Sequence, residues 1–286
     1  MTSVWSAFLA GITKVHTEPT TSDIRTIFQQ IGLCFLYLYV LTGAGMVWND
    51  WVDRDIDRQV ARTKNHPLAS GKIKTSEALS WMVFQYVVAW YILDFMLSGE
   101  DISYSLLPTT AGIILYPFCK RPTAQKLGVY PQFVLAGAAA WTIITGGAAV
   151  APEYLAYQYP LCMLVVTWIV YINTAYSYQD MVDDAKMKVN SLYVLAGGYL
   201  KLVVTVFAVG VPISIAWVLT RVDASPWLWI SWMGVWSVSY VEQLAGFSAT
   251  DPRSGGPVHA KNFALAAWTF VACSVELLLG VYPKLH

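Results

Sequence analysis

Long stretches with almost no charge recur along the whole chain, and their length restricts what it can fold into. A helix needs about 20 consecutive apolar residues to cross a hydrocarbon core of about 30 Å. Because the stretches are almost continuously apolar, they predict helices rather than the alternating strands of a membrane barrel. We expect spans at Ile27–Trp48, Ala78–Leu97, Ile102–Phe118, Tyr130–Val150, Tyr154–Tyr178, Leu202–Thr220, Pro226–Thr250 and Phe263–Tyr282.

The composition agrees with a lipid environment. Of the 286 residues, 56% are hydrophobic and only 13% are charged, whereas soluble domains carry about 25% charged residues. The 13 Trp and 17 Tyr residues suit aromatic belts at the two surfaces of a bilayer. A formal net charge of zero argues against a nucleic-acid partner. The lipid bilayer is therefore the expected surrounding partner.

The expected fold class is all-α, a multi-spanning transmembrane helical bundle with eight full spans plus a truncated first helix. That first helix is the apolar segment Val4–Ile12, which is too short to cross a membrane. The sequence shows no short repeat and no low-complexity linker, so residues 1–286 are expected to form one domain. The four cysteines show no Cys-x-x-Cys pair, and we interpret them as thiols without a metal or redox role.

Lys and Arg residues gather in the connections of one face. Because cytoplasmic loops carry the excess of Lys and Arg, this face is predicted to lie in the cytosol. Its cations include Arg54, Arg58, Arg62, Lys64, Lys72, Lys74, Lys120, Arg121, Lys126, Lys186, Lys188, Arg253 and Lys261.

Two groups of carboxylates lie on that same face, each continuing an apolar span. In the first, Asn49, Asp53 and Asp57 are four residues apart and share one helical face, with Asp50 nearby and Asp55 directed elsewhere. Carboxylates this close repel one another unless a cation joins them. Mg²⁺ takes oxygen ligands and is commonly shared with substrate phosphates. The pattern therefore predicts a magnesium site.

The second group predicts a continuous polar stripe on one helix, formed by Asn173, Ser177, Asp180, Asp184 and Lys188. Two such faces at the mouth of one bundle could hold two Mg²⁺ ions against one diphosphate. Acidic rings also occur in cation channels, but the Lys and Arg residues beside the first group suit an anion. A transporter would need broken helices at mid-membrane, and the acidic residues lie at helix ends.

Several motifs resemble one family. The run NDWVDRDID, Asn49–Asp57, resembles the Asn-Asp-x-x-Asp-x-x-x-Asp motif of the UbiA superfamily of intramembrane prenyltransferases, and ARTKNHPLASGKI resembles the segment after it. YPFCKR at Tyr116–Arg121, PQ at Pro131–Gln132 and QDMVDDAKMKVNS resemble the 4-hydroxybenzoate polyprenyltransferase branch. The resemblance implies nine helices around a central cavity that binds an isoprenoid diphosphate through Mg²⁺.

The resemblance also implies roles for residues of this chain. The expected metal ligands are Asn49, Asp50, Asp53, Asp57, Asp180 and Asp184, and the last four are also expected to act in catalysis with Arg121. Arg62, Lys64, Lys120 and Lys188 are expected to bind the diphosphate, and Arg121 could instead hold an acceptor carboxylate. Glu242 is a further catalytic candidate on separate grounds, because it is an ionisable residue inside an apolar span.

Three positions depart from the family pattern. His66 and Asn190 stand where Arg and Lys are usual, and Lys188 replaces a Gly. These departures leave the metal ligands intact but affect the acceptor side. The leading hypothesis is Mg²⁺-dependent prenyl transfer to an aromatic, phenolic acceptor through an allylic carbocation. The alternative is a terpene cyclase, in which the ionised chain attacks itself and no acceptor enters.

Overall fold

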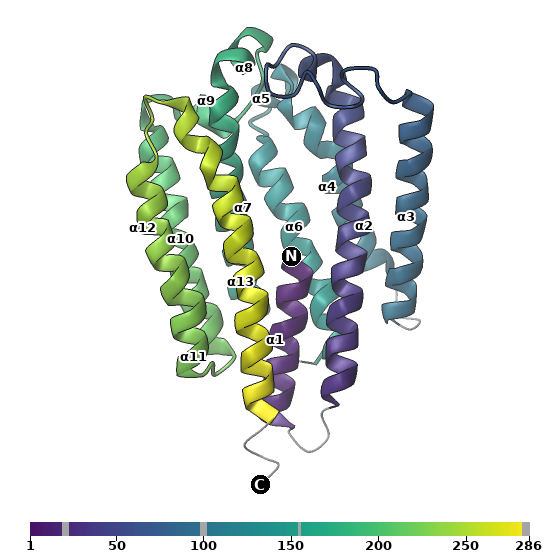
Figure 1. Cartoon of the computed structure of the whole chain (residues 1–286), viewed down its shortest axis with the longest axis vertical. Helices are drawn as coiled ribbons and strands as arrows, with labels where there is room; N and C mark the ends of the chain where they lie inside the picture. The colour runs from purple at the N-terminus through teal and green to yellow at the C-terminus, as the bar shows by residue number, and fades with distance from the viewer. Residues whose placement is uncertain (19–22, 98–101, 154–155, 282–286) are drawn as a thin grey trace.

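The computed structural model describes residues 1–18, 23–97, 102–153 and 156–281, and within these ranges the regular structure is entirely helical. Thirteen α-helices are labelled in Figure 1. Their bounds are α1 Thr2–Thr17, α2 Ile24–Asp57, α3 Thr75–Leu97, α4 Ile102–Leu115, α5 Pro122–Lys126, α6 Pro131–Val150, α7 Gln158–Ser177, α8 Met181–Met187, α9 Leu192–Ala196, α10 Leu200–Arg221, α11 Pro226–Leu228, α12 Val235–Gly246 and α13 Gly256–Val281.

Short segments of tighter or wider helix join some of these elements. The 3₁₀ turns are η1 Tyr116–Lys120, η2 Tyr178–Asp180, η3 Gly197–Tyr199 and η5 Pro252–Gly255, and η4 Trp229–Gly234 is a π-helical segment. Such segments often occur at functional positions. Two of them, η1 and η2, lie next to the charged motifs of the sequence, so the helical geometry changes where the candidate site begins.

Seven helices in the described part of the chain are long and apolar enough to cross a membrane. They correspond to seven of the eight predicted spans. The eighth, Pro226–Thr250, is helical only to Gly246 and contains the π-helical segment η4. Two predicted span limits, Tyr154 and Tyr282, lie outside the described residues. The predicted all-α, multi-spanning bundle is confirmed.

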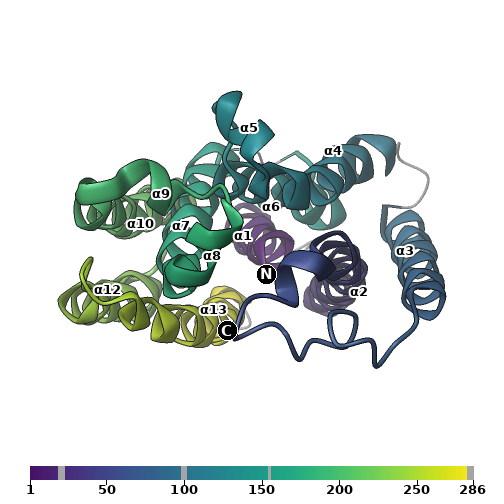
Figure 2. The ribbon, with the colours of Figure 1, turned by 90° about the horizontal axis from the view of Figure 1, so that it is seen from above.

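Helix α1 lies in the middle of the bundle when the molecule is seen from above (Figure 2). Trp5 on this helix is fully buried, and its ring packs against those of Trp168, Trp232 and Trp236. The backbone of Ser3 approaches α6 so closely that a Cβ on Gly146 would overlap its carbonyl oxygen. Small residues of this kind let membrane helices pack at short range. The short first helix is therefore a core element.

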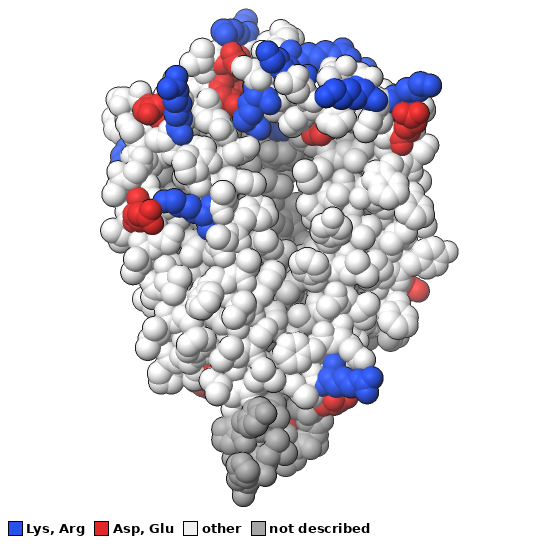
Figure 3. Space-filling model, viewed as in Figure 1, with Lys and Arg blue, Asp and Glu red and all other residues white. Residues whose placement is uncertain are grey.

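The outward surface is apolar along most of its height. Large side chains such as Tyr39, Phe95 and Val238 are more than two-thirds exposed, which suits lipid contact rather than water. Figure 3 shows most Lys, Arg, Asp and Glu side chains on this face gathered at one end of the molecule. It also shows a furrow below that end, walled by uncharged side chains. The protein is an integral, multi-pass membrane protein.

The second polar stripe does not form as predicted. Helix α7 ends at Ser177, the turn η2 follows, and α8 begins at Met181 as a separate helix. The turn η2 packs against η5, where a Cβ on Gly255 would overlap the carbonyl oxygen of Ala175. This tertiary contact, which hydrophobic periodicity does not report, ends the straight helix at the membrane surface.

Candidate active site

The first carboxylate group lies on the last turns of α2, as the spacing predicts. This helix runs without a break from Ile24 to Asp57, so Asn49, Asp53 and Asp57 share one face. The side chain of Asp53 is only 4% exposed, whereas that of Asp55 is 73% exposed and pairs with Arg58 at 3.0 Å. The expectation that Asp55 points away from the group is confirmed.

Two cations from the connection between α4 and α6 reach this group. The Nζ of Lys120, at the end of η1, donates to the Oδ1 of Asn49 at 2.8 Å and to the Oδ2 of Asp53 at 2.6 Å. The Nη2 of Arg121 donates to the Oδ1 of Asp53 at 3.0 Å and to the Val52 carbonyl at 2.9 Å. Asp53 therefore holds both cations, and a charge this well buried requires such partners.

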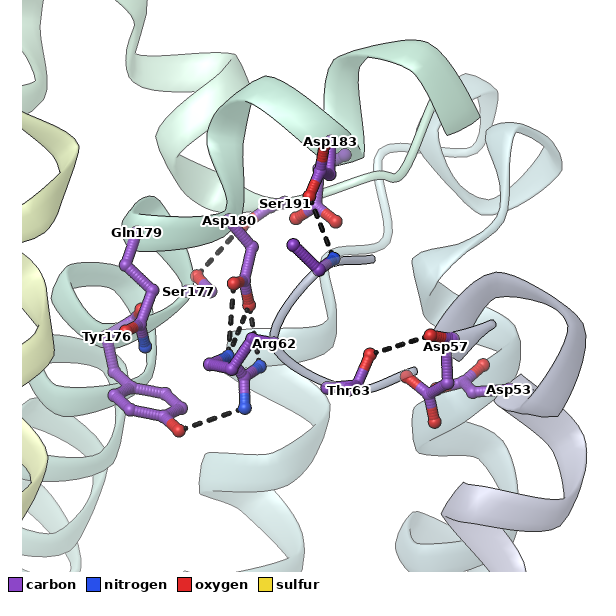
Figure 4. A network of polar contacts seen from close by, with 12 residues as sticks. Asp53, Asp57, Arg62, Thr63, Tyr176, Ser177, Gln179, Asp180, Asp183 and Ser191 are labelled. Carbon is purple, nitrogen blue, oxygen red and sulfur yellow. Dashed lines mark hydrogen bonds and ion pairs between the residues drawn. The ribbon is translucent and has the colours of Figure 1, made fainter. Parts of the chain in front are cut away.

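The connection after α2 crosses to the second carboxylate group (Figure 4). The backbone N–H of Ala61 donates to the Oδ2 of Asp183 at 3.0 Å. Arg62 donates through Nη2 to the Oδ2 of Asp180 at 2.6 Å and through Nη1 to the hydroxyl of Tyr176 at 3.1 Å. Burial alone would lower the pKa of Arg62, but the hydrogen bond and charge of Asp180 outweigh it and raise that pKa.

The second group includes a buried carboxylate on α8. Asp184 is 9% exposed and accepts a hydrogen bond of 2.7 Å from the hydroxyl of Tyr193. Tyr193, which follows on α9, was not among the sequence-predicted site residues, and no spacing rule links it to Asp184. Asp184 interacts electrostatically with both Lys120 and Arg62. The two carboxylate groups thus form one polar site with Lys120, Arg121 and Arg62.

The site offers ligands suited to a divalent cation. Carboxylate oxygens of Asp50 and Asp57 and a ring nitrogen of His66 lie within 4.8 Å of one another. The Nδ1 of His66 is buried with no hydrogen-bond partner among the described residues. Two carboxylates this close to each other and to an imidazole nitrogen fit a divalent cation that prefers oxygen ligands. Oxygens of Asn49, Asp53 and Asp180 accept hydrogen bonds from Lys120 or Arg62. Metal ligation stays a prediction for all six expected ligands, which are Asn49, Asp50, Asp53, Asp57, Asp180 and Asp184.

Three predicted site residues take no part in the hydrogen bonds and ion pairs described above for the two carboxylate groups. Lys64 and Lys188 are exposed. Lys188 has a φ of 53°, a left-handed conformation that favours glycine, which accounts for the Gly usual at this position in the family it resembles. Glu242 is 68% exposed and pairs with Lys261 at 2.6 Å. The structure therefore does not bring Glu242 to either carboxylate group.

The fold and this site together define an integral membrane protein with a cation-compatible polar site at one end of a helical bundle. The chain matches the model of the UbiA prenyltransferase family over residues 1–268. It is 49% identical over 282 residues to the polyprenyl transferase pyr6 of Aspergillus fumigatus, covering 96% of this chain and 88% of that protein. The chain belongs to the UbiA prenyltransferase family, and the predicted enzyme class, a prenyltransferase, is confirmed.

Solved structures agree with the fold. The structure of a UbiA homologue from Aeropyrum pernix, described as its apo form, superimposes with a TM-score of 0.73 at 16% identity and covers 97% of both chains. A UbiA homologue from Archaeoglobus fulgidus, bound to GPP and Mg²⁺, gives a TM-score of 0.64 at 15% identity, with 95% of this chain and 96% of that chain covered. At these identities the likeness establishes the fold alone.

Proposed function

We propose that this protein transfers a prenyl group from an isoprenoid diphosphate to an aromatic acceptor within the membrane, with Mg²⁺ as cofactor. The observation that carries the proposal is the pairing of two carboxylate groups with Lys120 and Arg62 at the mouth of an apolar bundle. Carboxylates recruit the metal, and the cations attract the anionic leaving group. Relatives named polyprenyl transferases and a homologue bound to GPP and Mg²⁺ support the same reaction.

The metal would be held by carboxylates of both groups. Asp50 and Asp57, with His66 beside them, would form one half of the site, and Asp180 and Asp184 the other. Bound there, Mg²⁺ would neutralise charge on the diphosphate oxygens and make the diphosphate a better leaving group. This role extends the sequence-based prediction, with His66 added beside the first group.

Lys120 and Arg62 would stabilise the departing diphosphate. Each is already held by a carboxylate, Lys120 by Asp53 and Arg62 by Asp180, so little reorientation is needed when the negative charge develops. Donors that are fixed before the reaction stabilise a transition state more effectively than mobile ones. The remaining predicted diphosphate ligands, Lys64 and Lys188, are exposed and would act by attracting the anion.

The carbocation left by ionisation must be kept from water. The uncharged furrow in Figure 3 lies below the charged end and offers an apolar path for the prenyl chain. The rings of Tyr116 and Tyr176 already lie beside cations, at 4.5 Å from the Lys120 Nζ and 5.2 Å from the Arg62 Cζ. Such rings attract positive charge by about 0.5–2 kcal/mol each. We also propose that this charged end faces the cytosol, as the distribution of Lys and Arg predicts.

Arg121 would receive an acidic acceptor. Burying a neutral polar group without a hydrogen-bond partner costs about 2–7 kcal/mol, and an unpaired ionised carboxylate costs far more. A planar guanidinium can pair such a carboxylate through two parallel hydrogen bonds. Both side-chain hydrogen bonds described for Arg121 come from a single terminal nitrogen, Nη2. The Arg121 side chain is 29% exposed, so it is not fully enclosed by its partners.

Arg121→Lys is therefore expected to raise the KM for a carboxylated phenol by roughly tenfold, because Lys keeps the charge but loses the bidentate fork. The KM for the isoprenoid diphosphate should change much less. Steady-state assays in membranes, varying each substrate in turn, measure both values. If only the KM for the diphosphate rises, Arg121 serves the leaving group, and the acceptor assignment is wrong.

A further inference from the structure

Asn190 is fully buried, and the hydrogen bonds that it donates go to the connection between α4 and α6 rather than to a carboxylate. It follows α8, after the left-handed turn at Lys188. Its backbone N–H donates to the Lys120 carbonyl at 2.8 Å, and its Nδ2 donates to the carbonyls of Cys119 at 2.8 Å and Val129 at 2.7 Å. One side chain thus joins both ends of the connection that carries Lys120 and Arg121.

The contacts of the Asn190 side chain fix the orientation of its amide. Both partners of the side chain are carbonyl oxygens, so the atom between them must donate two hydrogen bonds. The Oδ1 of Asn190 is buried with no partner among the described residues. Exchanging Oδ1 and Nδ2 would place an oxygen against two oxygens and lose both bonds. Only a side chain with two N–H groups at this distance satisfies the site.

A second side chain, that of Gln132, holds the residues that follow Asn190. Gln132, at the start of α6, donates to the Ser191 hydroxyl at 2.7 Å and accepts from the Leu192 N–H at 3.0 Å. The segment after α8 is therefore joined to the connection from Cys119 to Val129 by Asn190, and to the start of α6 by Gln132. That segment follows α8, the helix that carries Asp184.

We propose that Asn190 is a positioning residue that sets the reach of Lys120 toward the diphosphate. Lys120 can donate hydrogen bonds to Asn49 and Asp53 only if its backbone stays in the position that the hydrogen bond from the Asn190 N–H fixes. Misplacement of a reacting group by about 1 Å can cost roughly 100-fold in rate. The inference rests on the proposed function, since it assigns Asn190 to diphosphate ionisation.

The test uses Asn190→Asp, which keeps the volume of the side chain but removes both donated hydrogen bonds. We expect kcat for release of pyrophosphate to fall by roughly 10- to 100-fold, with little change in the KM for the acceptor. In a Lys120→Met background the same change should cause little further loss, because Asn190 acts through Lys120. Ser225→Ala is the matched control. It removes a partly buried hydrogen bond to Glu276, which is not among the proposed site residues, and should lower stability without changing kcat.

A second measurement needs no turnover. Hydrogen exchange followed by mass spectrometry should show faster exchange across residues 119–129 in Asn190→Asp than in the wild-type protein, and unchanged exchange there in Ser225→Ala. Exchange in that segment equal to wild type would overturn the inference. The inference would also be overturned if the fold-loss of kcat in the double variant equalled the product of the losses in Asn190→Asp and Lys120→Met, because the two residues would then act independently. If the wild-type protein releases no pyrophosphate, the proposed function fails. The exchange measurement still decides whether Asn190 holds the connection at residues 119–129.

Discussion

Asp57→Asn is expected to reduce prenyl transfer by about 100-fold or more, because an amide keeps the shape of the side chain but is a far weaker metal ligand. Asp57 lies with Asp50 and His66 in the group best placed to hold a cation. The loss should be larger at low Mg²⁺ and partly recovered at high Mg²⁺, since the variant weakens metal affinity. Product formation measured across a range of Mg²⁺ concentrations checks this.

Asp55→Asn provides the matched control two residues away. Asp55 is on the same helix but exposed, and it contacts Arg58 and Arg54 instead of the site. Exposed ion pairs contribute only about 0–1 kcal/mol to stability, so this variant should retain nearly full activity. Equal losses in the two variants, at equal amounts of folded protein, would refute the argument from the helical face.

Removal of divalent cations should have the second large effect. Excess EDTA is expected to abolish turnover entirely, because without the metal the carboxylates of both groups would repel the diphosphate. Added Mg²⁺ should then restore activity. EDTA saturated with Mg²⁺ before addition is the control for effects of the chelator on the membrane. Undiminished turnover in excess free chelator would contradict a metal-dependent reaction.

Much of the first half of the site could be predicted from residue spacing. A regular α-helix fixes which residues share a face, and α2 stays regular to Asp57. The spacing therefore predicted correctly that Asp53 and Asp55 lie on different faces of the helix, where Asp53 is buried and Asp55 is exposed. The uncharged spans were predictable for a similar reason, because a bilayer requires helices whose length matches its thickness.

The second half could not be predicted in the same way. The spacing from Asn173 to Lys188 assumed one straight helix, and packing of η2 against η5 breaks that helix after Ser177. Asp180 and Asp184 still reach the site, but from different elements. Contacts between segments far apart in sequence decide this, and single-sequence periodicity does not contain them.

The pairing of cations with particular carboxylates was likewise beyond the sequence. The motif indicated that Lys120 and Arg121 belong to the site, but their shared partner Asp53 lies far along the chain. Asn190 was visible only as a departure from the family pattern. Its burial and its three hydrogen bonds to the connection at 119–129 give that departure a physical meaning.

The most direct test of the proposed reaction is product identification in membranes containing the wild-type protein. The membranes would receive geranyl, farnesyl or geranylgeranyl diphosphate with Mg²⁺, with and without a phenolic acid, and products would be identified by mass spectrometry. We expect a prenylated phenol that forms only when the phenolic acid is present. A cyclic hydrocarbon or alcohol formed equally well without any phenol would contradict it and identify a terpene cyclase instead.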